Sequence, residues 1–141
     1  FKEFDLITPN EREARFALGD QDSTVGALAG LLNKATGCKL LLLKLGERGL
    51  FVSKPANDSD PGDYFSIDSF AENVVDAVGA GDALLAYATL AMMATKDEVV
   101  ASIIGSMAAA CECEFDGNIP IKPSDVLSRI DKVASAANYG S

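Results

Sequence analysis

The sequence predicts an α/β fold in which a largely parallel sheet is flanked by helices, and two observations indicate this class. Strand-like and helix-like segments alternate in the first half of the chain, and helix-like segments dominate the second half. Residues 39–45 (Lys-Leu-Leu-Leu-Leu-Lys-Leu) form an apolar run between Gly37 and Gly46, which is typical of a strand covered on both faces. Such a strand belongs inside a layered α/β sheet.

The other elements of the first half follow from local signals. Thr8 and Pro9 end a short strand, and Asn10 is a favourable N-cap for the helix that follows and continues to Leu18. A second helix has a wide apolar face and ends at Gly37. In chain order we expect a strand at 5–7, helices at 10–18 and 23–36, and strands at 39–45, 50–52 and 64–67.

The second half contains the longest apolar segments. A long buried helix is expected from residue 82 to 95, a second apolar helix from 99 to 114 and an amphipathic helix from 124 to 134. Residues 136–141 have little to bury and are expected to form a flexible tail. We therefore expect one domain with one core over residues 1–135.

Composition excludes several classes of function. The chain has 141 residues and a net charge of −9, which argues against nucleic acid or an anionic membrane as the main partner. It has no histidine, which removes His-based triads and most zinc sites. Cys38, Cys111 and Cys113 match neither a disulfide framework nor a metal-finger spacing, so we expect reduced thiols in a cytoplasmic protein.

The chain contains no predicted membrane or targeting segment. The longest apolar run, residues 83–94, is shorter than the roughly 20 residues that span a bilayer. No signal peptide is recognised at the start, and the first residue is Phe1 rather than Met. We interpret the sequence as a piece of a longer protein.

The most distinctive segment is Asp-Ala-Val-Gly-Ala-Gly-Asp at residues 76–82. It predicts a tight glycine-rich turn that leads into a helix, whose first backbone N–H groups are available to bind an anion. Asp82 in the same turn would repel a bound phosphate. An acid at this position is explained if it accepts the proton of an attacking hydroxyl. The alternative is a glycine-rich turn before a core helix, with Asp82 as its cap.

A second candidate site lies where the first strand meets the first helix. Asn10 and Glu13 are one helical turn apart, so both side chains can face the same crevice at the carboxyl end of a strand. An amide oxygen and a carboxylate suit a hydrated Mg²⁺ next to phosphates. The alternative is a capping box, in which the two residues satisfy each other's backbone N–H groups.

Two further segments carry small residues at positions where a ligand can approach. Lys44-Leu45-Gly46-Glu47-Arg48-Gly49 places two glycines after a strand, either next to a ligand or as a plain hairpin turn. Residues 105–110 (Gly-Ser-Met-Ala-Ala-Ala) form a small-residue helix face, which admits a flat adenine or packs closely against another helix.

These four segments, in their order along the chain, resemble the PfkB/ribokinase family of carbohydrate kinases. The family has a small residue such as threonine where Ala77 stands, a hydroxyl residue at Lys44 and an asparagine at Ser106. The resemblance implies a ribokinase-like layered fold, present here as its C-terminal half, and transfer of the ATP γ-phosphoryl group to a hydroxyl of a sugar or sugar phosphate. The residues that the resemblance implies are Asp82 as base; Gly79, Ala80 and Gly81 as an anion hole; Asn10 and Glu13 for Mg²⁺ through water; Asp76 for a monovalent cation such as K⁺; and Lys44, Gly46, Gly49, Ser106 and Gly117 at the nucleotide.

The same resemblance implies a cytoplasmic homodimer that binds a small sugar or sugar phosphate. Residues 6–11 resemble heptose-phosphate kinases, and fructokinase and ribokinase types remain open. Two alternatives stand beside the carbohydrate kinase: a vitamin kinase of the pyridoxal or hydroxymethylpyrimidine type, and a non-catalytic module that binds nucleotide or oligomerises.

Overall fold

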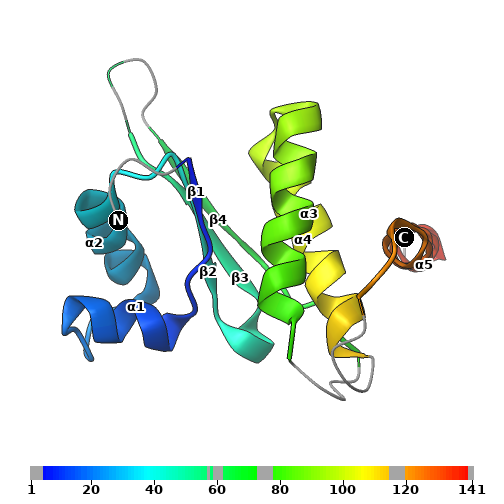
Figure 1. Ribbon diagram of the computed structural model, residues 1–141, viewed down its shortest axis with the longest axis horizontal. Helices are drawn as coiled ribbons and strands as arrows, with labels where there is room; N and C mark the ends of the chain where they lie inside the picture. The colour runs from blue at the N-terminus through cyan, green and yellow to red at the C-terminus, as the bar shows by residue number, and fades with distance from the viewer. Residues whose placement is uncertain (1–4, 57, 59–61, 73–77, 115–119, 140–141) are drawn as a thin grey trace. The chain divides into compact units, whose positions relative to one another are not determined.

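A computed structural model describes residues 5–56, 58, 62–72, 78–114 and 120–139 (Figure 1). The chain divides into two compact units, residues 1–69 and 70–141. Among the described residues, the first unit contains the sheet, two α-helices and a 3-10 helix, and the second unit contains three α-helices. No helix among the described residues is both long and apolar enough to cross a membrane.

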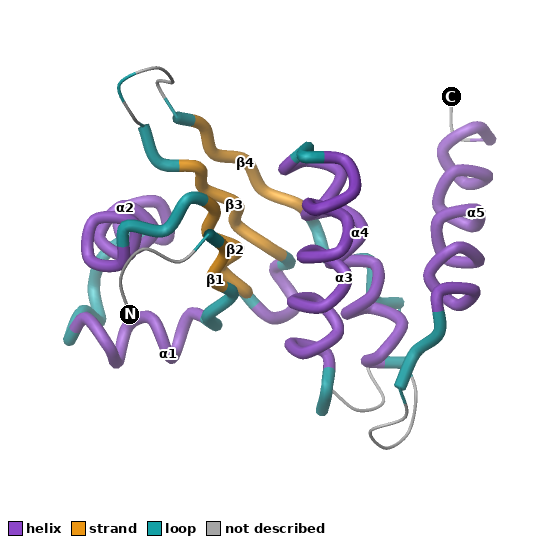
Figure 2. The backbone as a smooth tube through the Cα atoms, turned by 45° about the horizontal axis from the view of Figure 1, so that its top comes forward, coloured by secondary structure: helices purple, strands orange, loops and turns teal. Residues whose placement is uncertain are grey.

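The sheet of the first unit has four strands in the order β1-β2-β3-β4 (Figure 2). β1 pairs with β2 in parallel, with Leu6 opposite Leu40. β2 pairs with β3 and β3 with β4 in antiparallel register. The strands are β1 (Leu6–Ile7), β2 (Leu40–Lys44), β3 (Leu50–Lys54) and β4 (Asp63–Ile67).

The α/β class is confirmed, but within the described part of the chain the sheet is mixed rather than largely parallel. The lengths of the connections explain the difference. β2 and β3 are joined by a short link that contains the 3-10 helix η1 (Gly46–Arg48). A parallel pair requires a crossover of about a dozen residues or more, so this link permits only an antiparallel hairpin.

Two helices form the crossover from β1 to β2. They are α1 (Glu11–Leu18) and α2 (Val25–Thr36), and they lie on the same side of the sheet (Figure 1). The caps agree with the sequence signals, because Gly19 and Gly37 end the two helices in the left-handed conformation. Each helix therefore ends where the chain must turn back toward the sheet.

The core of the first unit lies between these helices and the sheet. The four leucines of β2 are all buried, as expected for a strand covered on both faces. The core cluster contains Ala14 of α1, residues of α2 and alternate residues of β2: Ala14, Leu28, Ala29, Leu32, Cys38, Leu41 and Leu43. This packing fixes the ends of β1 and β2 relative to the start of α1.

The second unit consists of α3 (Ala80–Thr95), α4 (Glu98–Cys113) and α5 (Pro123–Tyr139). α3 and α4 pack closely, since a Cβ added at Gly105 would lie 2.9 Å from the Cβ of Ala88. α3 is not buried on all sides as predicted, because Leu90 and Met93 are exposed. Packing against α4 buries only one stripe of the helix, around Ala83, Leu84 and Ala88.

α5 is longer than the sequence analysis expects. The helix was predicted to end near Ala134, with a flexible tail over residues 136–141, but it continues to Tyr139. Alanines at 134, 136 and 137 have the highest helix propensity, so nothing in this stretch ends the helix. Residues 140 and 141 lie outside the described residues.

Candidate functional site

The carboxyl ends of the two parallel strands bring two predicted site residues together. Asn10 follows β1, Lys44 ends β2, and the two form an isolated parallel bridge. The Lys44 N–H donates to the carbonyl of Pro9 at 2.9 Å. Because the carboxyl ends of parallel strands lie at the same edge of a sheet, the start of α1 and the turn after β2 lie next to each other at this edge.

Asn10 and Glu13 form the capping box that the sequence analysis gave as the alternative. The Glu13 N–H donates to Asn10 Oδ1 at 2.7 Å, and the Asn10 N–H donates to Glu13 Oε2 at 2.8 Å. The Glu13 carboxylate is exposed and keeps its second oxygen for other contacts. The second oxygen of Glu13 is therefore available to a metal ion or to a metal-bound water.

The two glycines after β2 have different structural requirements. Gly49 has φ of 88°, and a Cβ there would lie 2.0 Å from the carbonyl oxygen of Ile67. Gly46 also has a positive φ, 63°, but nothing lies within 4 Å of its Cβ position. Gly49 is therefore required by the contact with the end of β4, whereas Gly46 faces open space.

A pocket of about 940 Å³ lies between α1 and the end of β2. It brings together four of the predicted site residues, Asn10, Glu13, Lys44 and Gly46. The rest of the lining includes charged, polar and apolar residues: Glu11, Arg12, Arg15, Phe16, Gln21 and Leu45. Gly49 is not among the residues that line it.

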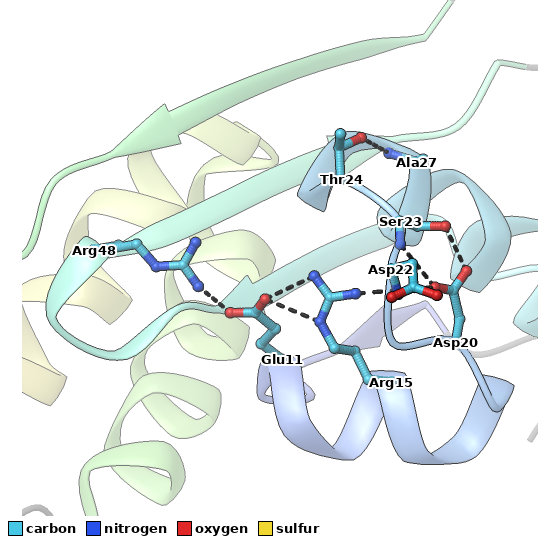
Figure 3. Close-up of polar contacts among 8 residues, drawn as sticks. All are labelled: Glu11, Arg15, Asp20, Asp22, Ser23, Thr24, Ala27 and Arg48. Carbon is cyan, nitrogen blue, oxygen red and sulfur yellow. Dashed lines mark hydrogen bonds and ion pairs between the residues drawn. The ribbon is translucent and has the colours of Figure 1, made fainter.

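A chain of ionic contacts borders this pocket (Figure 3). The Glu11 carboxylate accepts from Arg15 Nε at 3.0 Å and from Arg15 Nη2 at 2.8 Å, and it also pairs with Arg48 of η1. The hydrogen bond from Arg15, followed by the charges of the two guanidinium groups, holds the pKa of Glu11 below its usual value. Glu11 thus ties α1 to the turn after β2.

The same chain continues into the link between α1 and α2. Arg15 Nη1 lies 4.0 Å from Asp20 Oδ1. The carboxylate of Asp20 accepts from the backbone N–H of Ser23 at 2.9 Å and from its hydroxyl at 2.5 Å (Figure 3). These bonds from Ser23 lower the pKa of Asp20. The elements around the pocket are therefore connected by charge as well as by the apolar core.

In the second unit, the predicted anion hole coincides with the start of α3. Gly79 is the N-cap, with φ of 86° and no side chain to accept from the first turn. The first helical hydrogen bond runs from the Ala83 N–H to the Gly79 carbonyl at 3.0 Å. The N–H groups of Ala80, Gly81 and Asp82 therefore belong to the turn that has no intrahelical acceptors. Asp82 lies in this turn and is exposed.

The remaining predicted residues are not brought together in the described structure. Ser106 lies on α4 with only 8% of its surface exposed, and its neighbour Gly105 contacts α3. This burial favours close helix packing for the small-residue face. Asp76 and Gly117 lie outside the described residues.

Three residues of the pocket and its border were not predicted from the sequence: Glu11, Arg12 and Arg48. One signal was available, because Glu11 and Arg15 have the i, i+4 spacing of a helical ion pair. The pair between Glu11 and Arg48 joins distant parts of the chain, and no local pattern indicates it.

No group of three or more His, Cys, Asp or Glu that could enclose a metal ion is found among the described residues. Asn10 and Glu13 fit a hydrated Mg²⁺, which keeps most of its waters and needs few protein ligands. They do not fit an ion enclosed entirely by protein.

The family model described as pfkB family carbohydrate kinase matches residues 2–124. The bifunctional protein HldE of Pelobacter propionicus is 30% identical over 129 residues, which cover 89% of this chain and 25% of that protein.

Solved ribokinase structures share the fold. The ribokinase of Thermotoga maritima superposes with a TM-score of 0.76 at 25% identity, covering 90% of this chain and 42% of that one. The Arabidopsis thaliana ribokinase, complexed with ribose and ATP, gives a TM-score of 0.74 at 25% identity, covering 89% and 40%. The chain thus spans about a quarter of the HldE protein and about two fifths of each ribokinase. The match over most of its length shows that the chain belongs to the PfkB family of carbohydrate kinases.

Proposed function

We propose that the protein containing this chain transfers the γ-phosphoryl group of ATP to a hydroxyl of a sugar or sugar phosphate. The observation that carries the proposal is the start of α3, where a glycine N-cap without a side chain precedes a first turn that bears Asp82. Membership of the PfkB family supports the reaction class. Residues 1–135 would form the nucleotide-binding and catalytic part of that protein.

The backbone of the first turn of α3 would bind the transferring group. The N–H groups of Gly79, Ala80 and Gly81 would donate to phosphoryl oxygens, and the helix dipole adds to the attraction. Donors fixed in place stabilise charge that develops in the transition state, and loss of one such donor in other enzymes costs about 3–4 kcal/mol. Gly79 serves this role because it leaves the turn uncapped.

Asp82 would accept the proton of the attacking hydroxyl. It is exposed, so a substrate can reach its carboxylate without rearrangement of the helix. A general base must lie within hydrogen-bond reach of the proton that it removes, and Asp82 lies in the same turn that would bind the phosphoryl group. A cap alone would not need a carboxylate next to a bound phosphate.

The pocket of the first unit would bind nucleotide. Lys44 and Gly46 line this pocket, and Gly49 shapes the turn that contains them. Asn10 and Glu13 would hold the waters of Mg²⁺, which neutralises phosphate charge when bound. Ser106 and Gly117 would also contact the nucleotide, and Asp76 would bind a monovalent cation. The protein would be a cytoplasmic homodimer.

A single substitution in the full-length protein tests the assignment. Asp82→Asn removes the base but keeps the size of the side chain, so sugar phosphorylation should fall by at least a hundredfold. The affinity for Mg-ATP, measured by calorimetry, should stay within about twofold of the wild-type value.

A matched control makes the same chemical change at another helix start. Asp97 caps α4 by accepting from the N–H groups of Val99 and Val100, and asparagine caps as well as aspartate. Asp97→Asn should leave both activity and ATP affinity unchanged. Full activity of Asp82→Asn on every sugar that the wild type accepts would exclude Asp82 as the base.

A further inference from the structure

A buried arginine of α5 contacts the segment that leads into α3. Only 8% of the surface of Arg129 is exposed, and its guanidinium group donates to acceptors outside its own helix. Its Nη1 donates to the carbonyl of Phe70 at 3.4 Å and lies 3.8 Å from Oε1 of Glu72. Its Nη2 pairs with the carboxylate of Glu114, the C-cap of α4. Arg129 therefore joins the end of α4 to residues that precede α3.

Further contacts connect the same groups to one another. The other oxygen of Glu114, Oε1, accepts from the N–H of Glu72 at 3.1 Å. The Glu72 carboxylate also accepts from Lys132 of α5 at 2.8 Å. This hydrogen bond, followed by the charges of Lys132 and Arg129, holds the pKa of Glu72 below its usual value. Residues 70–72 are thus held through a carbonyl, an N–H and a carboxylate.

The start of α3 packs against the same part of the unit. Ala83 directly follows Asp82 in α3, and it belongs to a buried cluster with Val126 of α5 and with Met107 and Ala108 of α4. The side chain of Phe70 packs against this cluster as well. Residues 70–72 and the first turn of α3 are therefore both in contact with α4 and α5.

The burial of a charge on α5 needs an explanation beyond stability. Apolar side chains of similar volume stabilise a protein as well as a buried ion pair does or better, whereas the ion pair restricts the geometry of the groups that it joins. The guanidinium group is planar and presents its donors in fixed directions, which a lysine ammonium does not. Arg129 is therefore suited to hold Phe70 and Glu114 in one relative position.

We infer that Arg129 is a positioning residue for phosphoryl transfer: by holding residues 70–72 against the end of α4, it fixes the turn at the start of α3 that bears Asp82. The inference rests on the proposed function for the reaction that this turn performs. In this role Arg129 acts through the segment that it holds and not by contact with the substrate. A small displacement of a reacting group reduces the rate of an enzyme strongly, by about a hundredfold for 1 Å.

The test compares Arg129→Lys with the wild type in the full-length protein. The N–H groups of Glu72 and Ala83 are hydrogen-bonded, the first to Glu114 and the second to the carbonyl of Gly79. Their hydrogen exchange, which measures local opening, should become about tenfold faster or more. The kcat for sugar phosphorylation should fall about tenfold or more. The affinity for Mg-ATP should stay within about twofold.

A second variant breaks the same contact from the other side. Glu114→Gln keeps the size of the side chain and an acceptor for the Glu72 N–H, but it removes the charge that pairs with Arg129. It should change hydrogen exchange and kcat in the same direction as Arg129→Lys. The double variant should lose no more kcat than Arg129→Lys alone, because both substitutions break one contact.

The control lowers stability in the other unit. Asn33 of α2 donates to the hydroxyl of Ser53 at 2.7 Å, so Asn33→Ala should unfold at a lower temperature than the wild type. At a temperature where all variants are folded, its kcat and its hydrogen exchange at Glu72 and Ala83 should equal those of the wild type. A loss of kcat as large as that of Arg129→Lys would mean that stability alone is responsible, and the inference would fail.

The remaining outcomes separate the two proposals. Wild-type hydrogen exchange at Glu72 and Ala83 in both Arg129→Lys and Glu114→Gln would overturn the inference, and so would faster exchange with an unchanged kcat. Either result would leave the kinase reaction standing. A wild type that phosphorylates no sugar would contradict the proposed function, and hydrogen exchange would then decide alone whether Arg129 holds the turn.

Discussion

Asn10, the N-cap of α1, lies beside Lys44, the last residue of β2, in a parallel bridge at the end of the two parallel strands. Two segments that are far apart in the sequence therefore border one pocket. The parallel pairing of β1 and β2 is the cause, because it brings the carboxyl ends of both strands to the same edge. A slip of one residue in this pairing would turn Lys44 to the other face of the sheet.

Substitutions at the two residues of the α1 capping box should have different effects, one on stability and the other on the Mg²⁺ requirement. Asn10→Ala removes the acceptor of the Glu13 N–H and should lower the free energy of unfolding by about 1 kcal/mol. Glu13→Gln keeps the reciprocal bond, because glutamine serves in a capping box as glutamate does. It should unfold as the wild type does, yet require more Mg²⁺ for half-maximal activity. If Glu13→Gln and the wild type required the same Mg²⁺ concentration, Glu13 would act in the capping box and not in Mg²⁺ binding.

The ion pairs of Glu11 predict a stability that depends on pH. The pKa of Glu11 is lowered in the folded protein, so the unfolded state binds more protons in the acid range. The stabilisation is fully present above the ordinary glutamate pKa of about 4.3 and is lost as the pH falls through the lower, folded-state value. Glu11→Gln should therefore lower the free energy of unfolding at pH 7, by less than about 1 kcal/mol since Arg48 is 60% exposed.

The measurement is urea unfolding of both proteins at several pH values. The difference between wild type and Glu11→Gln should shrink steadily below pH 4.3 or so and vanish once Glu11 is protonated. Glu47→Gln is the matched control, an exposed acid of η1 that should show no difference at any pH. A difference for Glu11→Gln that stayed constant from neutral to acid pH would mean that its effect is not ionic.

Local signals in the sequence predicted the helices well and the sheet less well. Asn10 and Gly37 mark helix ends through their own side chain or backbone, so the sequence contains the information. The direction of a strand depends on the length of the connection that leads to it. The sheet was expected to be largely parallel, but the short link after Lys44 is long enough only for an antiparallel hairpin.

The candidate site was predictable in its parts but not in its electrostatics. Asn10, Glu13, Lys44 and Gly46 were all named from short patterns, and the pocket contains all four. The pairing of Glu11 with Arg48 could not be predicted, because it depends on how β2 turns into η1 beside α1. Which charged groups are paired therefore becomes visible only in the structure.

The close contact at Gly49 predicts a large loss of stability on substitution. Gly49→Ala would place a Cβ 2.0 Å from the Ile67 carbonyl oxygen in a backbone conformation with φ of 88°. Strain and overpacking together should lower the free energy of unfolding by about 3 kcal/mol or more. Loss of ATP binding in this variant would follow from misfolding of the turn and would not test a contact with nucleotide.

A helical glycine of the same unit provides the control. Gly30 lies exposed within α2, and nothing lies within 4 Å of its Cβ position. Gly30→Ala should raise the free energy of unfolding by about 0.5–1 kcal/mol, since alanine favours the helix. Urea unfolding checks both variants. Gly49→Ala with a wild-type midpoint would mean that β4 does not approach the turn as described.

Two glutamates near the end of α4 should respond in opposite directions to the same substitution. Glu112 is 3% exposed, and its Oε1 has no hydrogen-bond partner in the described structure. Glu114 accepts from the Glu72 N–H at 3.1 Å and pairs with the buried Arg129. Burial of an unsatisfied polar group is unfavourable by about 1–3 kcal/mol, whereas removal of one partner of a buried ion pair leaves a charge without compensation.

Glu112→Met should therefore raise the free energy of unfolding by about 1 kcal/mol, because methionine fills a similar volume without a buried, unsatisfied oxygen. Glu114→Met should lower it by about 2 kcal/mol, because the buried Arg129 would lose its nearer carboxylate and keep that of Glu72 at 3.8 Å. Urea unfolding of the full-length protein measures both changes. If Glu112→Met instead destabilised the protein, the carboxylate of Glu112 would contribute a favourable interaction in the folded state, which would contradict the expectation.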